Sequence, residues 1–362
     1  MEERRPVVGI TQGDSNGIGY EVIIKALSDP RILDMLTPVV YGSPKLFGFY
    51  KKGIHEIEQG DSNFILSAPE ALKGRLNILN CLPDNVFAEP GGATADSAEC
   101  AIKALEYAVK DLKEGKIDVL VTAPISKKAV VNAGFGFPGH TGFLQKEFGV
   151  QDVTMIMVSD RLKLGVVTGH IPIKDVPAAI TEDKIVSKLH LLKNSLEQDF
   201  AADNPRIAVL SLNPHSGYSG LLGTEEQEII IPAIKRANAE GVQAYGPFSP
   251  DGYFGMGHYE GFDATLAMYH DQGLPAFKAI AFQDGVNFTA GLPVIRTAPD
   301  HGAAFELAGR DEADPRSMRS AIFRAIDIYK NRKAWKALQE GKMIERPLED
   351  ERHDRPGKPQ IA

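Results

Sequence analysis

Short apolar runs of strand length alternate with segments of helical periodicity along most of this chain. The runs that we predict to be buried strands cover residues 7–11, 39–41, 119–122, 164–168, 207–212 and 264–268. Nearly continuous apolar strands separated by helices are typical of βαβ units, in which helices cover both faces of a parallel sheet. The pattern therefore predicts an α/β fold with mainly parallel sheets.

Two helices are clear from their periodicity. The first begins near Ile18 and continues through the run GYEVIIKAL. The second is longer, and Gly115 is its stop signal. Its apolar residues recur at intervals of three and four, as an amphipathic helix requires: Ala98, Ala101, Ile102, Leu105, Ala108, Val109 and Leu112.

Two interruptions of this alternation predict how the chain divides. The glycine- and proline-rich run NAGFGFPGHTG, residues 132–142, predicts a first crossover between domains, and residues 297–302 predict a second. A chain of 362 residues also exceeds one ordinary core. We expect a discontinuous α/β domain of residues 1–134 and 300–362 on the cofactor side, and a central α/β domain of residues 135–299. The charged tail from Glu345 is expected to extend over the surface.

Composition and charge exclude several classes of protein. The 40 basic and 48 acidic side chains give a net charge of −8. The chain therefore lacks the excess of positive charge that is typical of proteins that bind nucleic acid or an anionic membrane. No apolar run reaches the roughly 18 residues of a membrane span, and the opening MEERRPVVGITQG has no signal-peptide core. We therefore expect a cytoplasmic protein. Cys81 and Cys100 lack any ligand spacing and are expected to be packed thiols.

Three histidines follow predicted strands closely. His170 ends the run LGVVTG, His215 follows IAVLSL after two residues, and His270 follows ATLAMY. Any one of them, taken alone, is more simply an imidazole bonded to backbone. Ligands in open α/β sheets bind beyond the carboxyl ends of the strands, so three imidazoles delivered there can meet around one ion. Neutral imidazoles with Asp271 nearby suit zinc or another divalent ion.

Two glycine-rich loops are candidates for a cofactor. Gly13, Gly17 and Gly19 join the first predicted strand to the first predicted helix, where free backbone N–H groups can face an anion, although a glycine turn that only permits close packing fits equally well. The run DHGAAFELAG, with His301, Gly302 and Ala303, has small side chains that permit close approach to a flat ring or tight helix packing. We expect it to run into a helical segment.

The remaining candidates are polar residues in apolar or glycine-rich surroundings. His140 and Thr141 stand at the predicted start of a helix, where Thr141 could be simply an N-cap. Lys278, Asn287 and Arg296 could clamp a phosphate or carboxylate, because stranding such a charge without a partner is costly. Solvated surface charge is the alternative for either basic residue alone.

Taken together, these runs resemble the 4-hydroxythreonine-4-phosphate dehydrogenase family of vitamin B6 biosynthesis over nearly the whole chain. The motifs that carry the resemblance are GDSNGIGYE, TAPISK, GHTGFL, the strand-end His170, LNPHSG, AMYHDQGLP, GLPVIRT and DHGAAFELAG. Ser15 and Asn16 stand where that family commonly has Pro-Ala. Two of the motifs, GDSNGIGYE and DHGAAFELAG, also resemble the nicotinamide-site loops of isocitrate and isopropylmalate dehydrogenases.

The resemblance implies a two-domain fold like that of those dehydrogenases and a homodimer, with the active site in the cleft between domains and at the subunit interface. It implies that one divalent metal ion is held by His170 and His215 of one subunit and His270 of the other. It also implies a substrate site that consists of His140, Thr141, Lys278, Asn287 and Arg296.

The implied reaction is the oxidation of the C3 hydroxyl of 4-phosphooxy-L-threonine by NAD, followed by decarboxylation to 3-amino-2-oxopropyl phosphate. A divalent ion would favour both steps by drawing electrons toward the C3 oxygen. The proton acceptor is either Lys278 or Asp271, and the sequence does not choose between them.

Several alternatives stay open on the sequence alone. The first alternative is a sister dehydrogenase that acts on D-threonate or D-erythronate 4-phosphate. The second is a zinc-dependent hydrolase, and the third is a non-catalytic sensor of a nucleotide or metabolite. The metal is expected to be zinc, with magnesium, cobalt, nickel or manganese as alternatives, and the preference between NAD and NADP is open.

Overall fold

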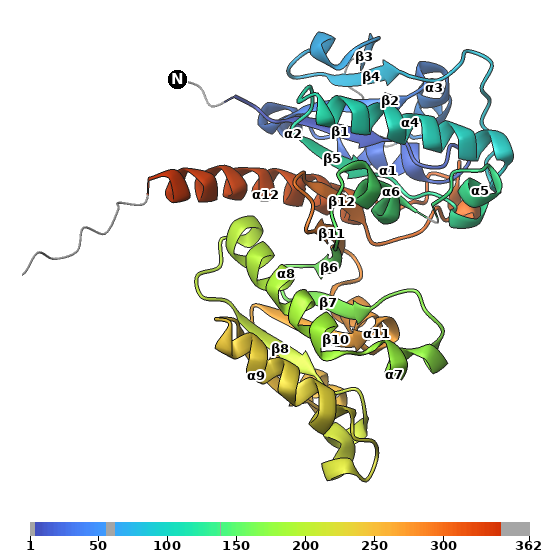
Figure 1. Cartoon of the computed structure of the whole chain (residues 1–362). Coiled ribbons are helices and arrows are strands. Elements are labelled where there is room, and N and C mark those ends of the chain that lie inside the picture. The colour runs from blue at the N-terminus through green and yellow to red at the C-terminus, as the bar shows by residue number, and fades with distance from the viewer. Residues whose placement is uncertain (1–3, 56–61, 138, 342–362) are drawn as a thin grey trace, which may run out of the picture.

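A computed structural model describes residues 4–55, 62–137 and 139–341 of the chain. Figure 1 shows two lobes, with β1 to β5 in one lobe and β7 to β10 in the other. The strands form a single sheet in the order β3-β4-β2-β1-β5-β12-β11-β6-β7-β10-β8-β9. The tail from Glu345, expected to be extended, lies outside the described residues.

The first five strands are β1 Val7–Thr11, β2 Thr37–Gly42, β3 Ser62–Ile65, β4 Leu76–Asn80 and β5 Val119–Thr122. The strands that follow them are β6 Thr154–Val158, β7 Lys163–Thr168, β8 Arg206–Leu210, β9 Gln243–Phe248, β10 Ala264–Tyr269, β11 Val286–Ala290 and β12 Arg296–Pro299. All six predicted strands are confirmed, with ends that differ by no more than two residues.

The shorter helices are α1 Gly19–Ala26, α2 Pro30–Met35, α3 Pro44–Lys52, α5 Lys127–Asn132, α6 His140–Glu147, α7 Val176–Ala179, α9 Ile231–Ala239 and α10 Pro250–Gly255. The longer helices are α4 Ala95–Lys113, α8 Glu182–Phe200, α11 His270–Ala281 and α12 Arg316–Glu340. The long predicted amphipathic helix is confirmed as α4, which begins with a capping box between Thr94 and Ser97.

Two parallel blocks of strands make up the sheet. The blocks β3-β4-β2-β1-β5-β12 and β7-β10-β8-β9 are joined by β11 and β6, which are antiparallel to each other, while β11 is antiparallel to β12 and β6 to β7. The mainly parallel α/β fold is thus confirmed, and the antiparallel junction was not predicted. The chain leaves the first block after β5 and returns to it at β12, which pairs directly with β5. The two blocks therefore belong to one continuous sheet, although both predicted crossovers lie between them.

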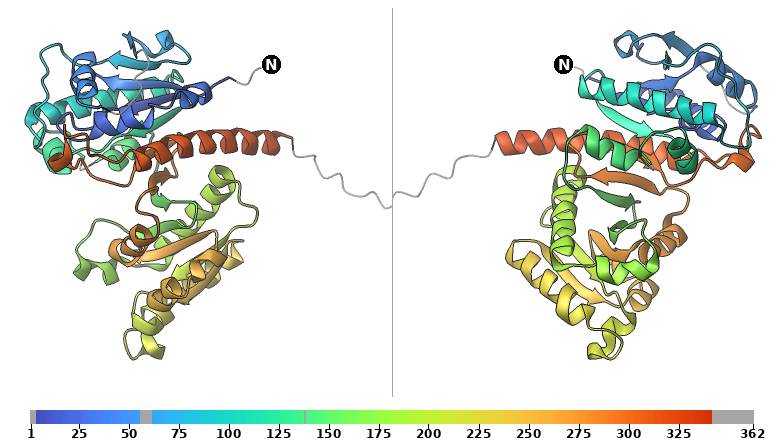
Figure 2. Two further views of the ribbon diagram at one scale, coloured as in Figure 1. Left: turned by 180° about the vertical axis from the view of Figure 1, so that it is seen from behind. Right: turned by 45° about the vertical axis from the view of Figure 1, so that its right-hand side comes forward.

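Helices cover both faces of this sheet (Figure 2). One core, which runs through both lobes, contains side chains of α1, α12, α8 and α9. On the other face, a core under α4 serves the first lobe and a separate core beside α11 serves the second. Between these two smaller cores, the middle strands of the sheet line a cavity on that face.

One predicted element is wrong. The segment after Asp300 was expected to run into a helix, but it forms only a three-residue 3-10 turn, Phe305–Leu307. Ala304, just before the turn, has a left-handed backbone with φ of 40°, a conformation that a non-glycine residue does not adopt inside a right-handed helix.

Candidate active site

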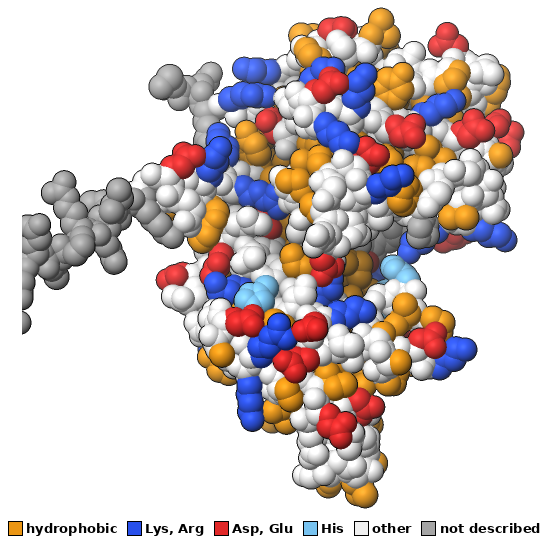
Figure 3. Space-filling model, in the orientation of Figure 1, with side chains coloured by type: hydrophobic (Ala, Val, Ile, Leu, Met, Phe, Trp, Pro, Cys, Tyr) orange, Lys and Arg blue, Asp and Glu red, His pale blue; other side chains and the backbone are white. Residues whose placement is uncertain are grey.

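A cavity of about 690 Å³ lies at the junction of the two blocks. Strands β5, β6, β7, β11 and β12 all contribute to its wall, together with the loops that follow β5 and β7. The face shown in Figure 3 is hollowed between the lobes, with histidine and basic side chains along the edge of the hollow. The predicted site residues that line the cavity are His140, Thr141, His170, Lys278, Asn287, Arg296, His301 and Gly302.

Arg296, at the start of β12, is a buried cation with no carboxylate partner among the described residues. Its side chain is 4% exposed, and its guanidinium donates hydrogen bonds to the hydroxyls of Thr122, at 2.6 and 3.0 Å, and Thr289, at 3.2 Å. Burial lowers the pKa of Arg296 to about 10. A buried guanidinium that faces a cavity with only hydroxyl partners is suited to an anionic ligand, because a ligand carboxylate or phosphate would compensate its charge.

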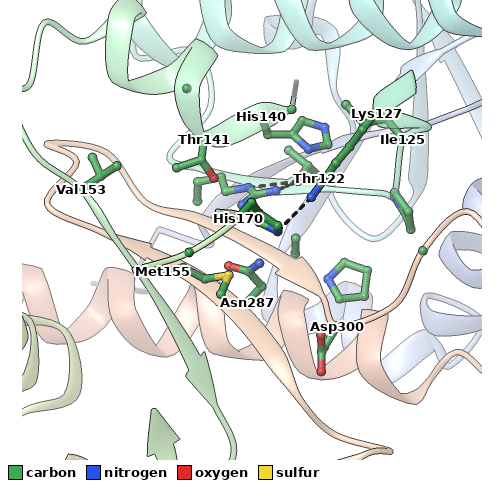
Figure 4. A pocket seen from close by; sticks show the side chains of 18 of the residues that line it. Thr122, Ile125, Lys127, His140, Thr141, Val153, Met155, His170, Asn287 and Asp300 are labelled. Atoms are coloured by element: carbon green, nitrogen blue, oxygen red, sulfur yellow. Dashed lines mark hydrogen bonds between the residues drawn. The ribbon is translucent and has the colours of Figure 1, made fainter. Parts of the chain in front are cut away.

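His140 lines the same cavity as Arg296, and Figure 4 shows its ring there. Burial lowers the pKa of His140 well below its usual value of 6.5, and the charges of Arg296 and Lys127 lower it further. Within the described part of the chain, its buried Nε2 has no hydrogen-bond partner, and neither has the buried Oδ1 of Asn287. Both atoms therefore remain available to a ligand. Helix α6 begins at His140 with Gly139 as its N-cap, so Thr141 is not the cap.

Two of the three predicted metal ligands lie close together within one chain. The ring centroids of His170 and His270 are 5.3 Å apart, because β7 and β10 are neighbouring strands. Lys127 Nζ lies 3.1 Å from His170 Nε2, and burial together with the Lys127 charge lowers the pKa of His170. Asp271 lies outside the cavity wall, 78% exposed, with its carboxylate 2.5 Å from His270 Nδ1. It can therefore orient the His270 ring.

His215 does not join this pair within one chain. It begins a run of five residues with left-handed backbone, from φ of 51° at His215 to 57° at Ser219. The buried carboxylate of Glu226 holds the base of this loop by accepting from the backbone N–H groups of Leu212 and Asn213. Such backbone strain is common at functional sites. The resemblance implied that His170 pairs with His215, whereas the observed ring pair in one chain is His170 with His270.

Lys278 lies in the cavity wall beside the pocket's acidic residue. Its Nζ is 3.3 Å from Asp300 Oδ1, and burial raises the pKa of Asp300, an effect that the Lys278 charge opposes. Asp300 Oδ2 has no hydrogen-bond partner among the residues that the structure describes. The two side chains therefore form an ion pair in the cavity wall that leaves one carboxylate oxygen unbonded.

The two predicted cofactor loops touch each other. Ile18 N–H donates to Ala303 O, at 3.0 Å, and a Cβ added to Gly17 would lie 2.7 Å from the same oxygen. Gly13, Gly17, Gly19 and Ala303 do not line the cavity, whereas His301 and Gly302 do. Asn16 ties the glycine loop to the start of α4, because its amide donates to Gly92 O and accepts from Glu89 N–H. The contact with Ala303 explains why residue 17 must be glycine.

Sequence reasoning missed Thr122 and Lys127 as site residues. Both belong to the strand-loop segment around TAPISK, which carried the resemblance but had no assigned role. Their importance comes from β5 lying beside β12 and from the approach of β7 across the cavity. Thr122 and Lys127 could have been identified as candidates, because polar side chains at the end of a predicted strand are typical of a binding site in this class of fold.

A divalent metal ion fits the imidazoles only in part within one chain. His170 lines the cavity, the His270 ring lies next to it, and a neutral imidazole is a good ligand for zinc. Among residues 4–55, 62–137 and 139–341, no group of three or more histidines, cysteines or acidic residues is placed to hold an ion. A complete site therefore needs a ligand from another chain, or a movement of the His215 loop.

Acidification is expected to destabilise the fold of the metal-free protein. Because His140 has a lowered pKa when folded, its stabilising contribution is present above the unfolded value of 6.5 and is lost as the pH falls below it. Each such group adds up to about 1.4 kcal/mol per pH unit to the slope of the free energy of unfolding against pH. Urea unfolding between pH 7 and 5 in the presence of a chelator measures the slope, which H140Q should reduce. An equal slope in H140Q would refute the assignment.

Comparison with known proteins decides the family. The family model described as "Pyridoxal phosphate biosynthetic protein PdxA" matches residues 34–325. The chain belongs to the PdxA family. A PdxA relative from Bacteroides thetaiotaomicron, named 4-hydroxythreonine-4-phosphate dehydrogenase, is 47% identical over 340 residues, which cover 94% of this chain and 93% of that protein. The resemblance that the motifs indicated is confirmed.

Two further similarities refine the comparison. The crystal structure of the Klebsiella pneumoniae enzyme of the same name has a TM-score of 0.79 at 32% identity, over 91% of this chain and 99% of that one. This PdxA chain is also 34% identical to a protein of Oceanobacillus iheyensis named "Putative D-threonate 4-phosphate dehydrogenase", over 90% of this chain and 98% of the other. In the part of the chain that the structure describes, no helix is long and apolar enough to cross a membrane.

Proposed function

We propose that this chain is an NAD-dependent dehydrogenase that oxidises the C3 hydroxyl of 4-phosphooxy-L-threonine and decarboxylates the product to 3-amino-2-oxopropyl phosphate. The observation that carries the proposal is the buried guanidinium of Arg296, which lines the same cavity as His170 and has no carboxylate partner among the described residues. The names of the most similar relatives agree with this reaction.

Residues of the cavity wall would hold the substrate. Arg296 and Lys278 supply positive charge for its anionic groups, and the unpartnered Oδ1 of Asn287 can accept a hydrogen bond from its amino group. His140, neutral at physiological pH, and Thr141 can bond the remaining oxygens. Fixing both ends of a small substrate holds its reacting carbon in one place.

Lys278 is the better of the two predicted proton acceptors, because Asp271 lies outside the cavity wall. To accept the hydroxyl proton, Lys278 must pass one of its own protons on. Asp300 lies 3.3 Å away, and burial raises its affinity for a proton. NAD, when bound, would supply the acceptor for the hydride from C3.

The loops of Gly13, Gly17, Gly19 and of His301, Gly302, Ala303 would bind the cofactor. They support this role because they contact each other and reach the cavity at His301 and Gly302. The preference for NAD over NADP is taken from the resemblance.

One divalent ion, with zinc as the preferred metal, would be held by His170, His215 and His270, and the chemistry that it supplies is Lewis acidity at the C3 oxygen. Asp271 would fix the His270 ring for this purpose. Since one chain does not bring the three rings together, a cytoplasmic homodimer with a shared site is the state that we propose.

An assay of NADH formation tests the proposed function. Purified protein is stripped of metal, reloaded with zinc, magnesium or cobalt, and given 4-phosphooxy-L-threonine and D-threonate 4-phosphate side by side. The proposal predicts that NADH formation depends on the metal and that 4-phosphooxy-L-threonine is the better substrate. A higher kcat/KM with D-threonate 4-phosphate would assign the chain to the sister activity, and turnover without NAD would indicate a hydrolase.

A further inference from the structure

The charges that line the cavity do not balance. Among the described residues of its wall there are four cations and one carboxylate, namely Lys127, Lys188, Lys278, Arg296 and Asp300. Two of these cations have acidic partners: Lys278 lies 3.3 Å from Asp300, and Lys188 lies 2.6 Å from Asp152. Arg296 contacts hydroxyls, and Lys127 contacts a ring nitrogen. The described part of the wall thus leaves two positive charges without a protein anion.

Local structure aims Lys127 into the cavity. It is the first residue of α5, and the preceding Ser126 caps the helix by accepting a hydrogen bond from Ala129 N–H, at 3.3 Å. From there its side chain reaches across to His170, as Figure 4 shows. Lys128, the next residue, is exposed as Lys127 is, but it does not line the cavity. Two adjacent lysines therefore have different surroundings, which makes one a control for the other.

The two uncompensated cations converge on one region. Lys127 and Arg296 line the same cavity as His140, the first residue of α6, and both charges add to the lowering of the His140 pKa. Residues 139–142 at the start of α6 also line the cavity, and Gly139 provides no side-chain cap for the free N–H groups there. A lysine, a buried arginine and a helix N-terminus form a set of donors suited to a group with two negative charges and several oxygens.

We propose that Lys127 binds the phosphate group of the substrate together with Arg296, exchanging its contact with His170 for phosphate oxygens. The inference rests on the proposed function for the identity of the phosphorylated ligand. A mobile lysine suits this position, because it can approach a phosphate as a point charge without the fixed geometry that a guanidinium needs.

Binding of inorganic phosphate to the metal-free protein tests Lys127 without turnover. In K127M the dissociation constant measured by calorimetry should rise about ten- to a hundredfold, as expected for loss of one charge-assisted hydrogen bond. K128M, which removes the same charge one residue away, should bind phosphate as the wild type does, and K127R should retain most of the affinity. Phosphate affinity in K127M equal to that in K128M would overturn the inference.

Kinetics separate the inference from the proposed function. With 4-phosphooxy-L-threonine, K127M should raise KM by a similar factor, about ten- to a hundredfold, with a smaller change in kcat. Its zinc content should match the wild type, which excludes damage to His170 as the cause. An unchanged KM in an active K127M enzyme would refute the role of Lys127 and leave the proposed reaction intact. Wild-type protein that binds phosphate through Lys127 yet forms no NADH with either substrate would refute the proposed reaction alone.

Discussion

Replacement of Arg296 by methionine is expected to lower kcat/KM for the phosphorylated substrate by about a thousandfold, which corresponds to about 4 kcal/mol of lost binding to a buried charge. The reason is that Arg296 is 4% exposed and contacts only hydroxyl groups in the protein, so its charge is compensated when an anion binds. Steady-state formation of NADH measures the effect. R296K, which keeps the charge but loses the planar fork, should be intermediate.

The stability of the R296M protein separates binding from folding. Removing a desolvated cation relieves a cost of the ligand-free fold, although the hydroxyls of Thr122 and Thr289 lose their donor. The melting temperature of ligand-free R296M should therefore change little, while the stabilisation by phosphate is lost. R324M serves as a control, because Arg324 pairs with Asp160 and does not line the cavity. A large fall in stability with ligand-induced stabilisation intact would contradict a binding role.

Replacement of any one of His170, His215 and His270 by alanine is expected to weaken zinc binding about a hundredfold or more and to reduce NADH formation to background. H215A is the most informative of the three, because His215 lies apart from the other two rings in one chain. Metal analysis after gel filtration measures the loss in a protein that stays folded. H190A, which removes a histidine that pairs with Glu240 instead, should keep its metal. Normal turnover in metal-free H215A would refute the metal site.

Mixing of inactive variants tests whether two chains share the site. If the three ligands divide two and one between the copies, two of the three pairwise mixtures of H170A, H215A and H270A should regain activity, about a quarter of the wild type, since random mixing gives half heterodimers with one intact site each. The pair that fails to regain activity identifies the two histidines that one copy supplies. No recovery in any mixture would show that a single chain holds the whole site.

Local pattern determines much of the fold of this chain. The six apolar runs became strands because continuous apolar segments are buried on both faces of a parallel sheet. The same logic predicted that His170 and His270 lie at strand ends, and the structure places them just after the neighbouring parallel strands β7 and β10. The antiparallel strands β6 and β11 were not predicted, because strand direction depends on how distant segments pair and not on local periodicity.

The parts of the site that escaped prediction depend on tertiary contacts. Thr122 becomes a partner of Arg296 because β5 and β12, far apart in the sequence, are adjacent in the sheet. Lys127 becomes a cavity residue because the loop after β7 approaches it. His215 departs from the simple strand-end position because the residues after β8 adopt a left-handed path, which no feature of the run PHSGYS predicts.

Anomalous diffraction from crystals grown with zinc and 4-phosphooxy-L-threonine tests the central claim most directly. The account predicts one zinc peak per chain, with nitrogen atoms of His170, His215 and His270 within about 2.1 Å of it and drawn from two copies of the chain. Zinc bound elsewhere, or bound with these three side chains pointing away from it, would contradict the account.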